Sequence, residues 1–170
     1  MLSVIRRAVA VASLVAVSAS VAQAQLKVDE IRVDLASLGV SGGNTALNAG
    51  IPGSIALGVY LNDKVALEPT LGIGYIKPDG GDGITVLSLG VFAPYYLKGD
   101  RGRNGIFVSP GVMITKVTDI DAAIDFGADI GVKKAMGDKV SWALAGTLRD
   151  GDSYGDAAIG ARFGLSVFWR

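Results

Sequence analysis

Large apolar residues at every second position, followed by a short turn, form a pattern that repeats seven times after residue 50. In the clearest copy, Ile55, Leu57, Val59 and Leu61 alternate with smaller residues and lead into the turn 62–64. Because side chains alternate between the two faces of a β-strand, this pattern predicts strands with one bulky apolar face. Together with an earlier strand, the predicted strands cover 26–38, 51–61, 65–76, 84–97, 105–117, 122–135, 140–149 and 157–169.

The connections between these strands are short and rich in turn-forming residues, as at 62–64, 98–104 and 136–139. No helical period of 3.6 residues competes with the alternation after the first 25 residues. Sequential strands joined by short turns predict an up-and-down antiparallel meander. An even number of strands returns the chain to the side on which it began, so we expect both termini and these three turns at the periplasmic end of a membrane barrel.

The second face of each strand decides which face points outward. In 140–149 that face carries Ser141, Ala143, Ala145 and Thr147, and in the first strand it carries Glu30, Arg32, Asp34 and Ala36. From the third predicted strand to the eighth this face is small and weakly charged, which makes it a poor exterior for a soluble protein but suits the crowded interior of a narrow barrel. The bulky apolar face then meets lipid, whereas a soluble lipocalin-like carrier would have the reverse arrangement.

Strand length and closure agree with the membrane orientation. A tilted strand needs about 9–11 residues to cross a bilayer, and an open sheet edge in lipid would leave backbone groups without partners. The predicted fold is therefore all-β: an eight-stranded antiparallel up-and-down transmembrane β-barrel.

The first residues are typical of a secretory signal peptide. Arg6 and Arg7 precede an apolar stretch, 8–19, and Ala22-Gln23-Ala24 offers a small-residue cleavage site. A membrane anchor helix is the alternative, although the stretch is short for a span. We expect a cleaved signal peptide at 1–24 and one barrel domain at 25–170.

Composition excludes several functional classes. The 170 residues are 50% hydrophobic, have a formal net charge of zero, and contain neither Cys nor His. There is no basic surplus for nucleic acid and no thiolate or imidazole ligand for a metal. We therefore expect no nucleic-acid partner, no metal, no cofactor and no catalytic residues.

Two segments carry a family resemblance: LGVYLNDKVALEPTLGIGY at 57–75 and GADIGVKKAMGD at 127–138. The chain resembles the small eight-stranded outer-membrane β-barrels of the OmpA/OmpX type. This resemblance implies export through the periplasm, contact with outer-membrane lipid, and delivery to the outer-membrane insertion machinery. Such machinery recognises the last strand, where Phe163, Leu165, Val167 and Trp169 alternate and Arg170 displaces the usual final aromatic residue. We expect a monomer.

A balanced set of charges is predicted to face the barrel interior: Arg32, Asp34, Glu68, Asp125, Asp129, Lys133, Arg149 and Arg162. Buried charges are costly unless paired, so four positive and four negative groups predict an ion-pair network that fills the lumen. The alternative is a narrow pore lined by these groups. Asp125 and Asp129 could also form an acid–base or cation site, but nearby Lys133 and Arg162 favour salt bridges.

Aromatic residues near strand ends are candidates for the membrane interface, namely Tyr75, Tyr95, Trp142 and Trp169. Lipid-modifying barrels usually rely on a His, which this chain lacks, so the sequence favours a non-catalytic structural or envelope-integrity role. A narrow porin-like channel for small solutes or ions and a surface adhesin remain the alternatives.

Overall fold

The computed structural model describes residues 27–41, 47–49, 54–76, 84–98, 100, 102–117, 121–151 and 157–169. The predicted signal peptide, 1–24, and its cleavage site lie outside the described residues. None of the described residues belongs to a helix long and apolar enough to cross a membrane.

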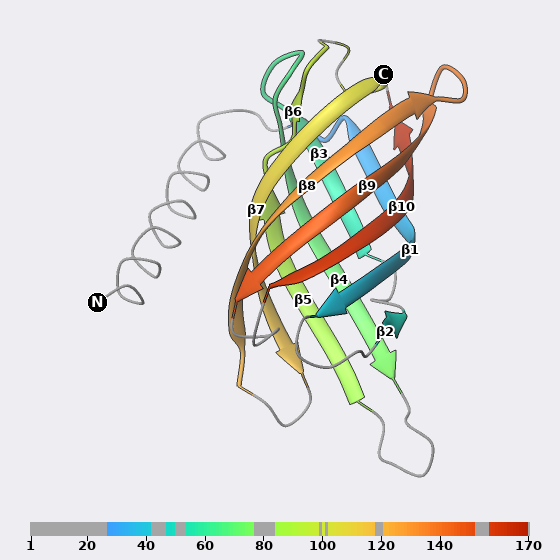
Figure 1. Ribbon diagram of the computed structural model, residues 1–170. Coiled ribbons are helices and arrows are strands. Elements are labelled where there is room, and N and C mark those ends of the chain that lie inside the picture. Colours follow the sequence, from blue (N-terminus) through green and yellow to red (C-terminus); the bar gives the residue numbers. More distant parts are fainter. Residues whose placement is uncertain are drawn as a thin grey trace.

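The described residues form a closed antiparallel barrel of eight strands (Figure 1). The sheet runs in the order β10-β9-β8-β7-β5-β4-β3-β1, and β1 pairs with β10 to close it. The predicted fold is confirmed. The elements are β1 (Glu30–Ser41), β2 (Leu47–Ala49), β3 (Ser54–Tyr60), β4 (Ala66–Ile76), β5 (Ile84–Phe92), β6 (Tyr95–Tyr96), β7 (Gly105–Val117), β8 (Ala123–Ala135), β9 (Val140–Gly151) and β10 (Ala158–Phe168).

Two short elements extend strands of the wall. β5 and β6 both pair with β7, and Ala93 between them donates its N–H to the carbonyl of Pro110 (2.8 Å). The predicted strand 84–97 is therefore interrupted locally, because Pro94 has no N–H to donate. β2 pairs with β1 beside Leu38 and Val40, so part of the stretch 41–50, expected to be a loop, is strand.

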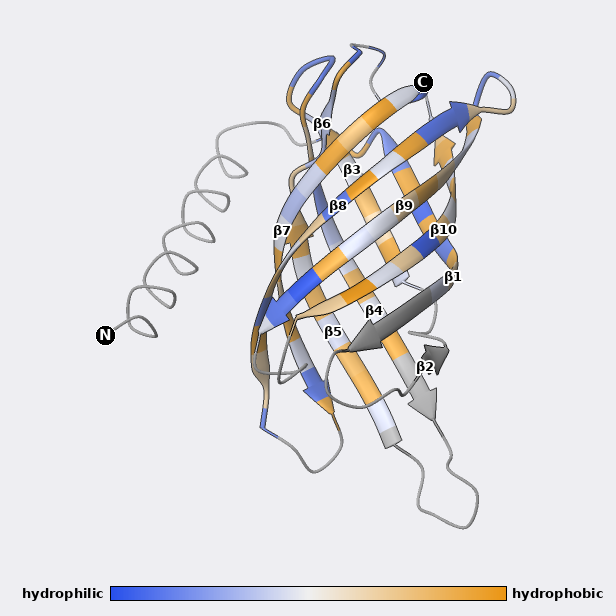
Figure 2. Ribbon diagram, in the orientation of Figure 1, coloured by the Kyte–Doolittle hydropathy of each residue, from blue (hydrophilic) through white to orange (hydrophobic). Residues whose placement is uncertain are grey.

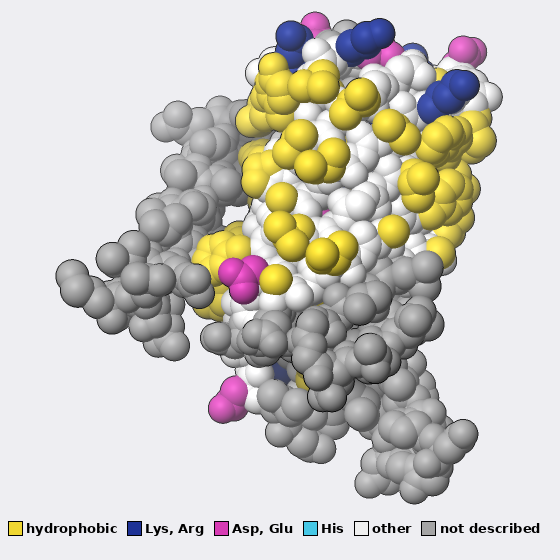
Figure 3. All heavy atoms as spheres, viewed as in Figure 1, with side chains coloured by type: hydrophobic (Ala, Val, Ile, Leu, Met, Phe, Trp, Pro, Cys, Tyr) yellow, Lys and Arg dark blue, Asp and Glu magenta, His cyan; other side chains and the backbone are white. Residues whose placement is uncertain are grey.

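Burial alternates along the strands as the sequence pattern predicts. In β9, Ala143 and Ala145 are 2% exposed, whereas Leu144 between them is 50% exposed. Large apolar side chains stand on the outside of every barrel strand. Figure 2 shows hydrophobic residues recurring along the strands, and Figure 3 shows hydrophobic side chains spread over the face of the wall in view. An exterior this apolar around a closed barrel is a surface that meets lipid.

One irregularity in β1 changes which residues face inward. The register passes from Asp34 opposite Gly164 to Ala36 opposite Phe163, which leaves Leu35 as the extra residue of a β-bulge. Ala36 is therefore exposed on the outer face, and Ser37 pairs with Arg162 on the inner face. The prediction that Ala36 faces inward is wrong, because a bulge shifts the alternation by one residue.

The barrel has a turn end and a loop end. Both described termini and the turns 61–65, 97–104 and 136–139 lie together at the turn end, the upper end in Figure 1. There, Asp29 donates its N–H to the carbonyl of Gly58 (3.0 Å) and accepts from the N–H of Trp169 (3.1 Å). The residues flanking the first strand, β1, and the last strand, β10, are thus hydrogen-bonded at the end of the barrel that the sequence predicts to face the periplasm.

Replacing Leu89, 59% exposed near the middle of the wall, with Arg tests the lipid-facing assignment. We expect Leu89→Arg to lower the free energy of unfolding in lipid vesicles by about 2–4 kcal/mol, because a cation at mid-depth loses its hydration. Urea titration followed by a heat-modifiable gel shift measures the effect. The matched control is Leu97→Arg, since Leu97 is 54% exposed beside the turn end. We expect it to cost at most about 1 kcal/mol; equal costs at both sites would contradict a lipid-facing wall.

Candidate functional site: the charged lumen

The middle of the lumen is crossed by a chain of ion pairs that starts on β4 and β1. Glu68 of β4 pairs with Nη1 of Arg32, and Nε of Arg32 donates to Oδ1 of Asp34 (3.1 Å). Ser54 donates its hydroxyl to the other carboxylate oxygen of Asp34 (2.6 Å). Asp34 therefore lies between a guanidinium and a hydroxyl, and it uses both oxygens within the barrel.

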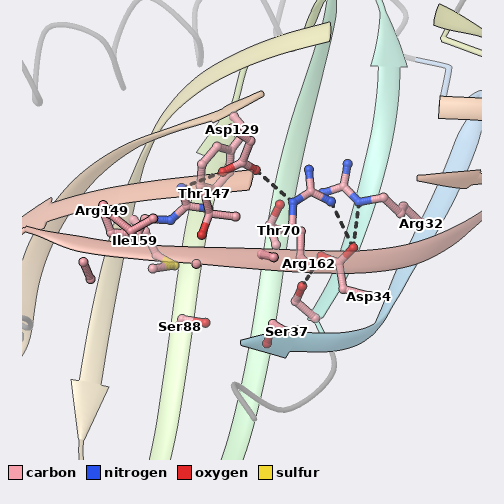
Figure 4. Close-up of a pocket in the computed structure, with 16 residues that line it drawn as sticks. Arg32, Asp34, Ser37, Thr70, Ser88, Asp129, Thr147, Arg149, Ile159 and Arg162 are labelled. Carbon is pink, nitrogen blue, oxygen red and sulfur yellow. Dashed lines mark hydrogen bonds and ion pairs between the residues drawn. The ribbon is translucent and has the colours of Figure 1, made fainter. Parts of the chain in front are cut away.

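Arg162 of β10 continues the chain across the lumen. Its Nη1 donates to Oδ1 of Asp34 (3.1 Å), and its Nε donates to Oδ2 of Asp129 (2.9 Å). Arg149 of β9 binds the other oxygen of Asp129 through Nη1 (2.6 Å). Figure 4 shows Arg162 between the two carboxylates, with Arg32 and Arg149 on either side. The six side chains, which we call the ion-pair layer, link β4, β1, β10, β8 and β9.

Glycines on the inner face make room for these long side chains. A Cβ on Gly164 would lie 2.5 Å from Oδ1 of Asp34, and one on Gly127 would lie 2.6 Å from Cδ of Arg149. Separations this short are well inside van der Waals contact. The small residues that identified the inner face in the sequence are thus the space into which the charged side chains fold.

A second cluster fills the lumen at the turn end. Lys133 of β8 pairs with Oε1 of Glu30, whose Oε2 accepts a hydrogen bond from the Tyr60 hydroxyl (2.5 Å). Tyr60 stacks on Tyr96 with ring centroids 6.1 Å apart, and Phe107 packs against Tyr96 at 5.7 Å. The Lys133 ammonium lies 5.1 Å from the ring centroid of Phe168. These six residues, which we call the aromatic plug, combine one ion pair with four rings: Glu30, Lys133, Tyr60, Tyr96, Phe107 and Phe168.

The described residues of the turn 97–104, namely 97, 98, 100 and 102–104, fold over the aromatic plug as a strap. Ser141 on the inner face of β9 donates its hydroxyl to the carbonyl of Arg103 (3.1 Å), and the side-chain oxygen of Asn104 accepts the N–H of Ala135 (2.9 Å). The Arg103 guanidinium lies 5.7 Å from the ring centroid of Phe168. Gly102, buried and at φ 67°, leaves no room for a Cβ, which would collide with Tyr60 and Tyr96. The strap therefore rests directly on the plug.

On the loop-end side of the ion-pair layer lies a cavity of about 100 Å³. Its floor is made by guanidinium and carboxylate groups of the layer, and hydroxyls of Ser37, Thr70, Ser88 and Thr147 line its walls. Figure 4 shows these side chains pointing into the same space. A polar cavity of this size holds a few water molecules.

The structure joins seven of the eight predicted inward charges in ion pairs, six in the ion-pair layer and Lys133 in the plug. Asp125, the eighth, is fully buried on the same face, nearer the loop end than Asp129. Both oxygens of Asp129 are bound by Arg149 and Arg162. The predicted ion-pair set omitted Glu30, although the alternation places it on the same strand face as Arg32 and Asp34, and the structure pairs it with Lys133.

Three of the four predicted interfacial aromatics fall at the turn end, whereas Tyr75 lies near the loop end of β4. Tyr95 and Trp169 are 45% and 49% exposed, and Trp142 is partly exposed on the outer face of β9. Tyr75 belongs to β4, but its side chain lies outside the described residues. Within the described part of the chain, no three acidic, Cys or His side chains gather as metal ligands would.

A double-mutant cycle on Glu30 and Lys133 tests the plug. We expect Lys133→Met to destabilise the barrel by about 3–5 kcal/mol, because Glu30 is left buried without its counter-charge. Adding Glu30→Gln should recover most of that loss, since the remaining groups are neutral. Urea unfolding in detergent micelles measures both. Lys134→Met, at the neighbouring exposed position, is the control and should cost little; a double variant as unstable as Lys133→Met would contradict the pairing.

Displacing the strap is the second test. Gly102→Val forces a side chain into the space of Tyr60 and Tyr96 at a left-handed φ, so we expect the strap to leave the barrel mouth. Trypsin should then cleave at Arg103, and amide exchange in 97–104 should rise, while the barrel stays folded. Gly137→Val is the matched control, because nothing lies within 4 Å of a Cβ built there. Unchanged protection in Gly102→Val would contradict the strap geometry.

No protein-family model and no curated protein matches this sequence. Five solved chains resemble its shape, among them the two that follow. Ail, the attachment invasion locus protein of Yersinia pestis, is 8% identical with a TM-score of 0.49, covering 84% of this chain and 99% of that chain. The outer membrane enzyme PagL is 16% identical with a TM-score of 0.45, covering 81% of this chain and 98% of that chain. The closed strand order, together with the apolar wall, is the architecture of a small eight-stranded outer-membrane β-barrel.

Proposed function

We propose that this protein is a structural component of the outer membrane, a closed barrel that neither conducts nor catalyses. The ion-pair layer is the observation that carries the proposal. Its charged groups fill the lumen from β4 to β9, and the side chains of Arg32, Glu68, Asp129 and Arg162 are at most 7% exposed. An ion that crosses the layer must separate buried pairs, and breaking one such pair costs about 3–5 kcal/mol.

The aromatic plug and the strap add a second barrier in series. Tyr96 and Phe107 are 1% and 2% exposed, and the Glu30–Lys133 pair lies beside them. The two barriers share no residue, although the Arg162 guanidinium of the layer lies 5.9 Å from the ring centroid of Phe107 in the plug. This redundancy supports a permanently closed lumen more strongly than either barrier alone.

The absence of catalysis is part of the same proposal. The chain contains no His or Cys, and Asp34 and Asp129 are each bound by two guanidiniums. Guanidiniums bind both oxygens of Asp129, whereas on Asp34 they bind Oδ1 and the Ser54 hydroxyl donates to Oδ2. A carboxylate held in this way is a poor general base, because both of its oxygens already accept hydrogen bonds. The ion-pair layer instead stabilises the barrel wall, because it links five strands to one another from inside the lumen.

Insertion and oligomeric state belong to the proposal as well. On the outer face of β10, Phe163 and Val167 are exposed and Trp169 follows at the turn end. We infer that the outer-membrane insertion machinery recognises this strand before it pairs with β1. Since that pairing closes the barrel, the folded chain is expected to be a monomer.

The cavity favours a second candidate, a narrow channel for small solutes or ions. It lies on the loop-end side of the ion-pair layer and reaches Arg149 and Arg162, with hydroxyls on its walls. In this alternative only the ion-pair layer and the plug separate the two sides, and thermal rearrangement of a few side chains would connect them.

Reconstitution into lipid vesicles separates these candidates. We expect folded protein to add no ion flux above that of empty vesicles, because both barriers remain closed. Mass spectrometry of the same vesicles, made with phospholipid and lipopolysaccharide, should find every lipid unchanged after incubation. A porin in parallel vesicles checks that flux is detectable. Step-like unitary conductance in planar bilayers would overturn the closed-barrel proposal in favour of the channel, and a modified lipid would overturn its non-catalytic part.

A further inference from the structure

The two ends of the barrel differ in charge. Lysines dominate the exposed charged residues of the turn end, and Figure 3 shows Lys and Arg side chains gathered there, at the top of the view. Aspartates dominate the loop end: among the described residues, exposed Asp121 and Asp150 accompany Lys116, and the linking sequences 77–83, 118–120 and 152–156 hold five Asp and one Lys. The turn-end residues in question are Lys27, Lys64, Lys98, Lys134 and Lys139 against Asp63, Asp100 and Asp138.

Three of these lysines accompany the exposed aromatics of the same end. Lys134 lies directly opposite Trp142 in the β8–β9 pair. The carbonyl of Lys139 accepts the N–H of Phe168 (2.8 Å), which places Lys139 beside the end of β10 and Trp169. Lys98 follows Tyr95 by three residues at the end of β6. Two of these pairs lie at the β8–β9 hairpin and its neighbour β10, and the third lies just after β6.

The depth of these residues in the membrane explains why lysines accompany aromatic residues at this end. Trp and Tyr side chains on the outside of a barrel prefer the level of the lipid headgroups. A lysine beside such a ring lays its aliphatic stem along apolar surface and extends its ammonium toward water. At that depth the ammonium meets lipid phosphates. The exposed apolar residues Leu97 and Met136, 54% and 58% exposed, continue the lipid-facing wall up to this level.

We propose that Lys98, Lys134 and Lys139 bind the phosphates of anionic phospholipids in the leaflet that surrounds the turn end. This lysine rim is continuous with the lipid-facing wall, and its charge is complementary to an anionic membrane surface. The acidic loop end lacks that complementarity, so the contact belongs to the turn end alone. The rim holds the barrel at a fixed depth and distinguishes its two ends.

Folding in vesicles of defined composition tests the proposal. The triple variant Lys98→Gln/Lys134→Gln/Lys139→Gln keeps side-chain length and removes the charge. Lys116→Gln, an exposed outward position at the loop end of β7, is the matched control. Wild type, the triple variant and Lys116→Gln should share one unfolding midpoint in zwitterionic detergent micelles, which establishes that the substitutions leave the barrel intact. For each protein, the folded-to-unfolded ratio is then compared between vesicles of two lipid compositions.

For the wild-type chain, we expect the folded-to-unfolded ratio to rise about tenfold when phosphatidylglycerol replaces a third of the phosphatidylcholine. The triple variant should gain less than about twofold, Lys116→Gln should gain as much as wild type, and 0.5 M salt should abolish the gain. A triple variant that gains as much as wild type, or a Lys116→Gln variant that loses the gain, overturns the proposal. So does inorganic phosphate in zwitterionic vesicles, if it reproduces the effect without anionic lipid.

Discussion

Closure of the sheet is the constraint on which the rest of the structure depends. A strand edge exposed to lipid would leave a row of N–H and C=O groups without partners, at a cost of several kcal/mol for each group. Pairing of β1 with β10 along nearly their whole length removes both edges at once. Closure also explains why the outer face can be apolar on every strand. In a sheet with no edge, the backbone N–H and C=O groups of each strand are hydrogen-bonded to its neighbours and need no water.

A closed barrel of eight strands is narrow, and its interior must be filled by its own side chains. Here the filling is largely ionic, which is expensive unless every charge finds a partner. The structure meets that condition by sharing: Asp34 binds both Arg32 and Arg162, and Asp129 binds both Arg162 and Arg149. Glycines beside these groups are therefore part of the same solution, because any side chain there would compete for the space.

Alternation, read together with the small residues of the second strand face, was enough to predict the barrel, the outer face and the inward direction of most charges. It could not predict features that depend on contacts across the lumen. Which carboxylate binds which guanidinium is set by the tilt and stagger of strands far apart in sequence, as for Arg162 and Asp34. Leu35 could not be identified as a bulge, since its residue type fits the regular pattern, and the error at Ala36 followed from that.

The strap shows a different reason why sequence reasoning stops short. The stretch 98–104 has the composition of an ordinary solvated turn, yet its middle lies against Tyr60 and Tyr96. What permits this is one glycine at φ 67° combined with an inward serine on β9 that binds the carbonyl of Arg103. Neither the glycine nor the serine can be interpreted from the sequence, because their roles depend on the barrel bringing β9 and the turn together. A turn of polar composition therefore covers the end of the lumen as the strap.

The division of the lumen follows from the same geometry. Hydroxyls and a small cavity occupy the loop-end side, while paired charges fill the middle and rings with one ion pair fill the turn end. Rings pack densely and exclude water, so they suit the end covered by the strap. Charges pair best where several strands can supply partners, as they do at mid-height. The order of cavity, ion pairs and rings thus leaves the open space of the lumen on the loop-end side and puts the packed rings beneath the strap.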